Sequence, residues 1–428
     1  MDILVIGGGG REHAIVEKLR QNPEVETIYA LPGNGGIAAQ AQCVDIKATD
    51  IEGIVGFAQS HKVDFAVVAP DDPLALGAVD RLEALGIPCF GPNKAAARIE
   101  ASKVFAKGLM EKYHIPTAKC RVFHQAQEAL NYVDSCPLPT VVKADGLALG
   151  KGVLICQTRE EAREAVQAMM VDKRFGDSGS RVVVEEFLQG PEVSVLAFTD
   201  GKTIKPMVSS MDHKRAGDGD TGLNTGGMGT IAPNPLYTPE IAQRCMEEIF
   251  LPTIRAMAQE GCPFKGCLYF GLMLTQDGPK VIEYNCRFGD PETQVVLPLM
   301  TSDLLSVMQA VAAGNLADTP VEFSKGAACC VMVVSGGYPG AYAKGKAIDV
   351  GGAEQVPGAT LYHSGTALDA QGRLVTAGGR VLGACGVGPT LEQAIHTAYQ
   401  AAEQIRFQGA FMRRDIGKKA LELARLQA

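Results

Sequence analysis

The first hundred residues alternate between apolar stretches of strand type and amphipathic stretches of helix type, and this alternation limits the fold more than any other feature. One amphipathic stretch, residues 11–21, places Ile15 and Leu19 on the same face of a helix. A second helix is expected over residues 74–86. Strands are expected over residues 2–7, 26–31, 64–70 and 87–92. Such an order predicts a parallel, doubly wound sheet that binds ligands at the carboxyl ends of its strands.

The rest of the chain is organised differently, and the whole chain of 428 residues is long enough for roughly three domains. A helix over residues 102–113 leads into a small α+β unit that ends with a strand near residue 188. A third segment reaches about residue 325. The final hundred residues are richer in strands and close with a helix opened by the capping box Thr390-x-x-Gln393. We therefore expect a multidomain protein of mixed α/β and α+β class.

The charge balance argues against nucleic acid and anionic membranes as partners. The chain has 40 basic and 48 acidic residues, a net charge of −8, so phosphate-bearing ligands must be held by local sites. Its 12 cysteines form no CxxC pair, which favours reduced thiols. The N-terminus begins in a strand without a basic leader, and no apolar run approaches the roughly 20 residues that span a bilayer. We expect a cytoplasmic protein.

The stretch "VVKADGLALGKGV" (141–153) is a strand that opens into a glycine-rich loop. It is not a P-loop, because Gly146 and Gly150 are one residue too close and Gly152 replaces the hydroxyl residue that binds Mg²⁺. The residues that follow are again strand-like. A glycine-rich loop between two strands suits a flap over phosphates, with Lys143 on the strand and Lys151 at the tip.

The N-terminal "GGGGREH" (7–13) lacks the third glycine of a dinucleotide fingerprint. Glycine amides at a helix N-terminus beside Arg11 suit a phosphate monoester, and a tight structural turn is an equal alternative. The stretches "PGNGG" (32–36) and "PDDPL" (70–74) end the next strands on the same edge. There Asp71 could bind sugar hydroxyls, whereas Asp72 reads as a helix cap.

Two later stretches also carry candidate residues. In "VVEEFLQGPEVS" (183–194), the backbone groups at the end of the strand could bind the edge of an adenine, and Glu192 could bind a ribose. Acidic residues at a strand end are, however, usually only solvated. The stretch "SMDHKRAGDGDTGLNTGGMG" (210–229) has no apolar period, and we expect a long structureless loop that closely approaches an anionic ligand.

The stretch "KVIEYNCRFGDPETQ" (280–294) is the most informative. Glu283 and Asn285 share one face of a strand, because side chains alternate with a period of two. Two hard oxygen ligands on one face suit Mg²⁺, whose other positions go to phosphates and water. Arg287 continues the face and could neutralise a transferring phosphoryl group. A solvated strand face would explain Glu283 but not the following "RFGDPET".

These stretches, in matching order over nearly the whole chain, resemble the phosphoribosylamine–glycine ligase family (glycinamide ribonucleotide synthetases) of the ATP-grasp superfamily. "DHKRAGDGDTGLNTGGMG" and "NCRFGDPETQ" are specific to this family. The resemblance implies an ATP-grasp fold of two α+β subdomains between an N-terminal doubly wound domain and a C-terminal β-rich domain. The expected boundaries are 1–101 for the N-terminal domain, 102–120 with 190–325 for the main ATP-grasp subdomain, 121–189 for its lid, and 326–428 for the C-terminal domain.

The resemblance also implies an activity: ATP-dependent ligation of glycine to 5-phosphoribosylamine through glycyl phosphate, without a protein nucleophile. The implied ATP-binding residues are Lys103, Lys143, Lys151, Glu185, Glu186, Phe187, Leu188 and Glu192. Magnesium or manganese would be held by Glu283 and Asn285. Phosphoribosylamine would meet Gly10, Arg11, Asn34, Gly36 and Asp71, the last in place of the family's usual glutamate. Arg287, Asp212 and Lys214 are the candidate catalytic residues, and His213, Gly289 and Asp290 complete the substrate contacts.

Three alternatives remain open from the sequence. The first is another ATP-grasp carboxylate–amine ligase of purine metabolism, which should lack "HKRAGDGDTG". The second is an NAD-dependent oxidoreductase, which the missing glycine disfavours. The third is a nucleotide sensor that binds ATP without turnover. The small-molecule partners expected are ATP, glycine and 5-phosphoribosylamine, and the labile amine leaves room for a transient contact with the enzyme that makes it.

Overall fold

The computed structural model describes residues 1–148 and 152–427. Its N-terminal part is the predicted parallel sheet, in the order β3-β2-β1-β4-β5. The chain first adds β2 and β3 on one side of β1 and then adds β4 and β5 on the other side. Its strands are β1 (Asp2–Gly7), β2 (Thr27–Pro32), β3 (Gln42–Cys43), β4 (Phe65–Val68) and β5 (Cys89–Phe90). Its helices are α1 (Gly10–Leu19), η1 (Ile37–Ala39), α2 (Ile51–Ser60), α3 (Asp71–Leu76), α4 (Ala78–Glu83) and α5 (Lys94–Ala101).

Two local expectations in this part are wrong. The helix expected over residues 74–86 is divided into α3 and α4 by Gly77, whose φ of +90° favours glycine and ends the first helix. Asp72 is not a helix cap: Pro70 occupies that position, and Asp71 and Asp72 both lie in the first turn of α3. Ile15 and Leu19 are fully buried on one face of α1, as predicted.

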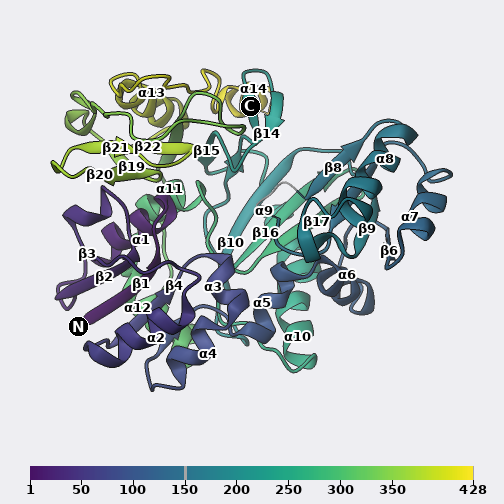
Figure 1. Ribbon diagram of the computed structural model, residues 1–428, viewed down its shortest axis with the longest axis horizontal. Helices are drawn as coiled ribbons and strands as arrows, with labels where there is room; N and C mark the ends of the chain where they lie inside the picture. Colours follow the sequence, from purple (N-terminus) through teal and green to yellow (C-terminus); the bar gives the residue numbers. More distant parts are fainter. Residues whose placement is uncertain (149–151, 428) are drawn as a thin grey trace.

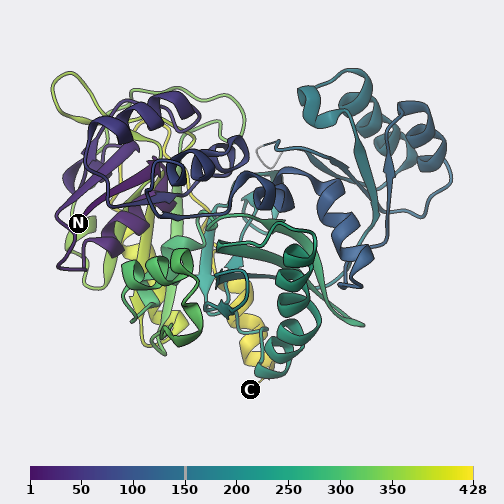
Figure 2. The same cartoon turned by 90° about the horizontal axis from the view of Figure 1, so that it is seen from below.

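The lid is a four-stranded antiparallel sheet in the order β6-β9-β7-β8, reached through α6 (Lys103–Lys112). It forms a projecting unit in both views (Figures 1 and 2), and its buried side chains make a hydrophobic core of their own. Its strands are β6 (Cys120–Phe123), β7 (Thr140–Ala144), β8 (Val153–Cys156) and β9 (Val182–Glu186). Its helices are α7 (Ala126–Val133), α8 (Arg159–Val166), η2 (Gln167–Val171) and η3 (Gly176–Gly179).

The central sheet is antiparallel, in the order β11-β10-β16-β17, and lies between the lid and the N-terminal sheet (Figure 1). Its strands are β10 (Glu192–Thr199), β11 (Ile204–Pro206), β16 (Gly266–Thr275) and β17 (Gly278–Asn285). The associated helices are α9 (Pro239–Cys245), η4 (Met246–Phe250), α10 (Leu251–Gln259), α11 (Thr293–Val296), η5 (Leu297–Leu299), α12 (Leu304–Ala313) and η6 (Leu316–Asp318).

The C-terminal sheet is antiparallel and has the order β12-β15-β18-β22-β19. It combines strands on both sides of the boundary expected at residue 326, because β12 (Met211–Asp212) and β15 (Gly229–Ala232) join β18 (Ala327–Val334), β22 (Arg380–Gly388) and β19 (Ala359–His363). The remaining elements are β20 (Thr366–Leu368), β21 (Leu374–Thr376), η7 (Ala353–Gln355), α13 (Leu391–Ala402) and α14 (Lys418–Gln427). Cys329 and Cys330 lie buried in β18, as expected.

Residues 210–229 are not structureless, contrary to the prediction. Between β12 and β15 they form a β-hairpin of β13 (Arg215–Gly217) and β14 (Thr221–Asn224), which pairs with no other strand in the part of the chain that the structure describes. The predicted final helix is α13, with Thr390 as its cap, but Gln393 does not return the hydrogen bond of a capping box, and α14 follows it.

A pair of buried histidines joins the N-terminal and C-terminal parts. The backbone N–H of His363, at the end of β19, donates to Nδ1 of His13 on α1 at 2.8 Å. The two rings meet edge to face with their centroids 5.4 Å apart, and each side chain is more than nine-tenths buried. Burial lowers the pKa of His13 to about 3, with a further contribution from His363, and lowers that of His363 to about 4. Both imidazoles are therefore neutral in the folded protein.

Candidate active site

The glycine run after β1 forms the predicted turn at the carboxyl edge of the parallel sheet. Gly7 has a φ of +121°, which glycine adopts without strain. A Cβ atom on Gly10 would lie 2.5 Å from Nε2 of Gln294 and 2.6 Å from Oγ of Ser364. The N-terminus of α1 is therefore enclosed by residues from distant parts of the chain, as a small anion site at a helix N-terminus requires.

Arg11 ties this edge to the segment after β17. Its Nε donates to Oε1 of the buried Glu12 at 2.7 Å, and its Nη1 donates to the carbonyl of Phe288 at 3.1 Å. Its backbone N–H donates to Oδ2 of Asp290 at 3.2 Å. Two guanidinium nitrogens are thus used inside the protein, which leaves part of the group for a ligand.

Asn34 and Gly36 contact other residues of the protein. Nδ2 of Asn34 donates to the carbonyls of Gly8 (3.0 Å) and His363 (2.7 Å), and its Oδ1 accepts from the backbone of Gly36 and Ile37. A Cβ atom on Gly36 would lie 2.2 Å from the ring of His363. These residues shape the turn beside the glycine run, and the side chain of Asn34 already meets two donors and two acceptors.

Glu100, which the sequence did not single out, organises the end of β17. Its Oε2 accepts from the backbone N–H of Cys286 at 2.7 Å, and its Oε1 accepts from Nη2 of Arg287 at 2.9 Å. In the orientation that satisfies its amide, Asn285 donates from Nδ2 to the same Oε1 at 3.0 Å. One buried carboxylate on α5 therefore orients three consecutive residues. The amide oxygen of Asn285 is left for another partner.

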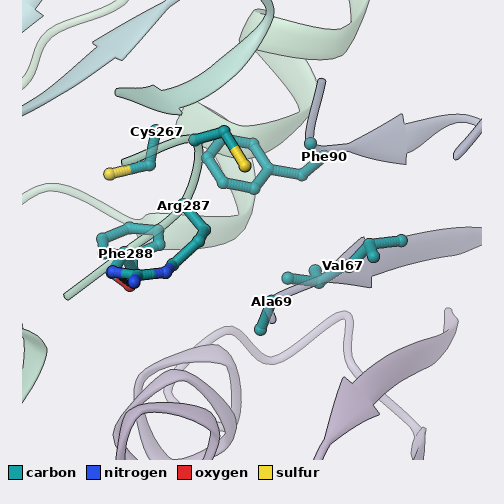
Figure 3. Close-up of a pocket in the computed structure, with 9 residues that line it drawn as sticks. Val67, Ala69, Phe90, Cys267, Arg287 and Phe288 are labelled. Carbon is teal, nitrogen blue, oxygen red and sulfur yellow. Dashed lines mark hydrogen bonds between the residues drawn. The ribbon is translucent and has the colours of Figure 1, made fainter. Parts of the chain in front are cut away.

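Arg287 lies where the central sheet meets the parallel sheet. Burial opposes its charge, but Glu100 and Asp71 together raise its pKa, so the guanidinium is charged. Its Nε is buried and has no hydrogen-bond partner among the residues that the structure describes. Figure 3 shows Arg287 and Phe288 gathered with Val67, Ala69, Phe90 and Cys267 around a cavity of about 10 Å³. That cavity is about the size of one water molecule, so substrates must bind elsewhere.

The charges of three lysines act on Glu283 of β17. Lys103, Lys143 and Lys214 all act electrostatically on its carboxyl group, together with Arg287. Burial alone would raise the pKa of Glu283, but these cations bring it below its ordinary value, so the group is ionised. The lysines come from α6, the lid strand β7 and the segment before β13. A dense positive field around one carboxylate is the electrostatic arrangement that a polyphosphate with a divalent ion needs.

A divalent cation fits Glu283 and Asn285, because both can present a hard oxygen from the same strand. Residues 1–148 and 152–427 contain no group of three or more His, Cys, Asp or Glu side chains that could hold a metal ion. The protein would thus supply two ligands, and the other positions would go to ligand oxygens and water, as is usual for Mg²⁺.

The lid contributes a buried ion cluster. Glu185 on β9 lies 2.9 Å from Nζ of Lys143 and 3.2 Å from Nζ of Lys107, and all three side chains are about 95% buried. Lys103 reaches the glycine-rich loop, since its Nζ donates to the carbonyl of Gly146 at 3.1 Å. Burial lowers the pKa of Lys103, and Glu283 partly offsets this.

The predicted adenine strand ends at Glu186. Glu186 is exposed, and its Oε1 accepts from the backbone N–H of Lys119 at 3.0 Å, whereas Phe187 and Leu188 follow the strand half-buried. Glu192, on β10, pairs with Nζ of Lys214 at 2.9 Å. Lys151 lies outside the described residues.

Only one member of a pair of acidic residues was predicted from the sequence. Asp212 was predicted, but its neighbour Glu292 was not, although it lies in the quoted "DPET". Burial, and then the charge of Glu292, raise the pKa of Asp212 well above its ordinary value, and burial raises that of Glu292. Tyr269 donates from its hydroxyl to Oε1 of Glu292 at 3.0 Å. Asp212 is half-buried, Glu292 is buried, and the charge of Glu292 acts on Asp212, so this pair favours a bound cation such as an ammonium group.

The last three predicted residues have contacts of different kinds. His213 is buried, and both ring nitrogens face backbone groups: Nε2 accepts from Gly417 N–H at 3.1 Å and Nδ1 lies 3.1 Å from the carbonyl of Gly229. The structure therefore leaves it no nitrogen for a substrate. A Cβ atom on Gly289 would lie 2.4 Å from Oε2 of Glu292. Asp290 accepts from Arg11, and its pKa falls because Arg380 and Arg11 outweigh burial.

No helix among the described residues is both long and apolar enough to cross a membrane. Residues 1–100 match the N domain of phosphoribosylglycinamide synthetase, residues 101–293 its ATP-grasp (A) domain, and residues 328–419 its C domain.

Curated relatives match over the whole length. The phosphoribosylamine–glycine ligase of Vibrio cholerae is 48% identical over 432 residues and covers 100% of both chains. That of Caldanaerobacter subterraneus is 47% identical over 416 residues, covering 97% of this chain and 99% of the relative.

Solved structures agree on the fold. The crystal structure of phosphoribosylamine–glycine ligase from Thermotoga maritima superposes with a TM-score of 0.86 at 35% identity, covering 97% of this chain and 100% of that chain. The biotin carboxylase domain of 2-oxoglutarate carboxylase from Hydrogenobacter thermophilus, solved with MgADP, has a TM-score of 0.73 at 17% identity and shares the fold, covering 96% of this chain and 91% of that chain. This chain belongs to the phosphoribosylamine–glycine ligase family of ATP-grasp enzymes.

Proposed function

We propose that this chain joins the carboxylate of glycine to the amine of 5-phosphoribosylamine, using ATP and giving glycinamide ribonucleotide, ADP and phosphate. The observation that carries the proposal is that the charges of Lys103, Lys143, Lys214 and Arg287 all lower the pKa of Glu283, while Nζ of Lys143 donates to the carbonyl of the adjacent Ile282 at 3.2 Å. This cluster lies between the lid and the central sheet, and Arg287 connects it to the edge where Arg11 and the glycine run lie. A triphosphate site and a phosphate-monoester site are thereby joined through one short segment.

Lys103 and Lys143 are assigned to the ATP phosphates, because they come from opposite sides of the lid junction and their charges meet at Glu283. Residues Glu185 to Leu188 are assigned to the adenine, and Glu192 to the ribose. When bound, a magnesium or manganese ion held by Glu283 and Asn285 would supply further positive charge at the triphosphate. Arg287 is assigned to the charge that builds on the transferring phosphoryl group, because its guanidinium is charged and acts electrostatically on Glu283.

Glycine is assigned to the space between Lys214 and the carboxylates of Asp212 and Glu292. Its ammonium group would relieve the repulsion between those two acids, and its carboxylate would lie toward Lys214 and the phosphates. Glycine oxygen attacks the γ-phosphorus, and the bond to the β–γ bridging oxygen breaks to release ADP. The amine nitrogen of phosphoribosylamine then attacks the acyl carbon of glycyl phosphate, the carbon–oxygen bond to phosphate breaks, and the nitrogen loses a proton.

Phosphoribosylamine is assigned to the edge formed by Gly10, Arg11 and Asp71. The enclosed N-terminus of α1 supports a phosphate there. The division into an N-terminal domain, a lid, a main ATP-grasp subdomain and a C-terminal domain is proposed with the boundaries given above, β12 and β15 excepted. All twelve cysteines are free thiols, which suits a reducing compartment such as the cytosol.

The test is ADP release with ATP, glycine and freshly made phosphoribosylamine, omitting each in turn. Turnover must require both acceptors. Substitution Arg287→Lys keeps a charge beside Glu100 but cannot present the same planar donors, so kcat should fall far more than ATP affinity. Full turnover without glycine would contradict the proposed reaction, and unchanged kcat in the variant would remove Arg287 from the chemistry.

A further inference from the structure

A short C-terminal segment, Arg413 to Gly417, grips the hairpin β13–β14 from outside the ATP-grasp region. We call this segment the C-terminal clamp. The hairpin lies beside the C-terminal helix α14 in Figure 1. Because β13 and β14 pair with no other strand among residues 1–148 and 152–427, the hairpin needs contacts of this kind to hold one conformation.

Arg413 is the centre of the clamp. Its side chain is about 98% buried, although the hairpin that it holds is largely exposed. Nε and Nη2 donate to the two carboxylate oxygens of Asp415, each at 2.8 Å, which fixes the guanidinium plane. Nη1 then donates to the carbonyl of Arg215 and to Oδ1 of Asp220, each at 3.0 Å. One buried side chain therefore holds both the first residue of β13 and the turn that precedes β14.

Two backbone N–H groups and the carboxylate of Asp415 make further contacts of the clamp. Arg414 N–H donates to Oδ1 of Asp218 at 2.8 Å, and Oδ2 of Asp415 accepts from Gly219 N–H at 2.9 Å. Gly417 N–H donates to Nε2 of His213 at 3.1 Å. Since Nε2 accepts, the proton of the neutral ring lies on Nδ1, which donates to the carbonyl of Gly229.

The two residues that flank Lys214 are thus both held by the clamp, His213 by Gly417 and Arg215 by Arg413. The Lys214 side chain points toward Glu192, and its charge reaches Glu283, Tyr269 and Asp212. A shift of the flanking backbone would move the ammonium group relative to the phosphates. Displacements of about 1 Å at such a group can lower a rate about a hundredfold.

We propose that Arg413 is a positioning residue, which acts through the C-terminal clamp to fix Lys214 for the glycine-dependent step. The inference rests on the proposed function, because it takes Lys214 as the group between glycine and the phosphates. Arg413 touches no substrate in this account. Its effect should therefore be confined to glycine kinetics and should not reach the ATP-binding lysines of α6 and β7.

The experiment compares Arg413→Ala with Arg414→Ala in the full chain. Arg414 is an ideal control, because its side chain pairs with Glu403 at the surface and only its backbone touches the hairpin. Arg413→Ala is expected to lower kcat/KM for glycine at least tenfold, with ATP affinity, measured by calorimetry, within about twofold of wild type. Arg414→Ala should match wild type. In a double-mutant cycle, adding Arg413→Ala to Lys214→Ala should cause little further loss.

Unchanged glycine kinetics in Arg413→Ala, an equal loss in Arg414→Ala, or fully additive losses with Lys214→Ala would overturn the inference. If Arg413→Ala fails to fold by circular dichroism, Arg413→Lys replaces it, since an ammonium group cannot bond Asp415 and the hairpin in the same plane. Hydrogen exchange of residues 213–224 tests the clamp separately from the proposed function. Faster exchange in the variant supports the clamp even if wild type shows no glycine-dependent turnover, whereas unchanged exchange refutes it.

Discussion

Acidification should weaken the contact between α1 and β19, and the buried histidine pair sets the size of the effect. His13 and His363 have folded-state pKa values of about 3 and about 4, below the roughly 6.5 expected in an unfolded chain. Between these values the unfolded state binds more protons than the folded state. The stability that the two neutral histidines contribute is therefore fully present above pH 6.5 and is lost as the pH falls. Each histidine should cost about 2.5 kcal/mol between pH 7.5 and pH 4.5.

The substitution His13→Asn isolates this effect, because the asparagine oxygen can still accept from the His363 backbone N–H. The assay is native-state hydrogen exchange of peptides from α1 and β19, corrected for intrinsic rates, which reports the free energy of opening at this contact. On going from pH 7.5 to pH 4.5, the variant should lose about 2.5 kcal/mol less than wild type. His396→Asn is the control, because that side chain is exposed on α13. An equal acid loss in His13→Asn and wild type would refute the assignment.

Three further predictions concern the site. Glu283→Gln should abolish magnesium-dependent ADP release while the fold, followed by circular dichroism, is kept; full activity would refute the metal assignment. Gly10→Ala would place a methyl group 2.5 Å from Nε2 of Gln294. In steady-state kinetics, KM for phosphoribosylamine should therefore rise at least tenfold while KM for ATP stays unchanged. An unchanged KM for phosphoribosylamine would show that this edge does not bind that substrate. Glu185→Gln removes the buried carboxylate with which Lys107 and Lys143 both pair, so hydrogen exchange should show the nucleotide-free lid destabilised by about 3 kcal/mol; a lid as stable as wild type would contradict this.

The parallel sheet was predictable because its evidence is local. Strand and helix periods alternate in the first hundred residues, and burial of Ile15 and Leu19 follows directly from their spacing. Gly77 shows the limit of that reasoning. A single glycine within a helical pattern may be tolerated or may end the helix, and the sequence of the helix alone does not decide between these outcomes.

The site was predictable where chemistry is concentrated in short motifs. Glu283, Asn285 and Arg287 lie within five residues, and strand alternation placed the first two together. Glu100 was missed because it lies in an ordinary amphipathic helix, and its role comes from residues almost two hundred positions away. The hairpin within residues 210–229 was missed for a related reason: its stabilising contacts are with Arg413 and its neighbours, so its own sequence shows no apolar period.

The position of the clamp, almost two hundred residues after the hairpin that it holds, has a consequence for synthesis. A ribosome makes residues 413–417 long after the lysines that we assign to ATP and after Glu283. A nascent chain can therefore fold the segments that we assign to the nucleotide before the hairpin is set in place. A chain released before residue 413 would then bind ATP without spending it on glycine, so catalytic competence would report that translation had passed the clamp.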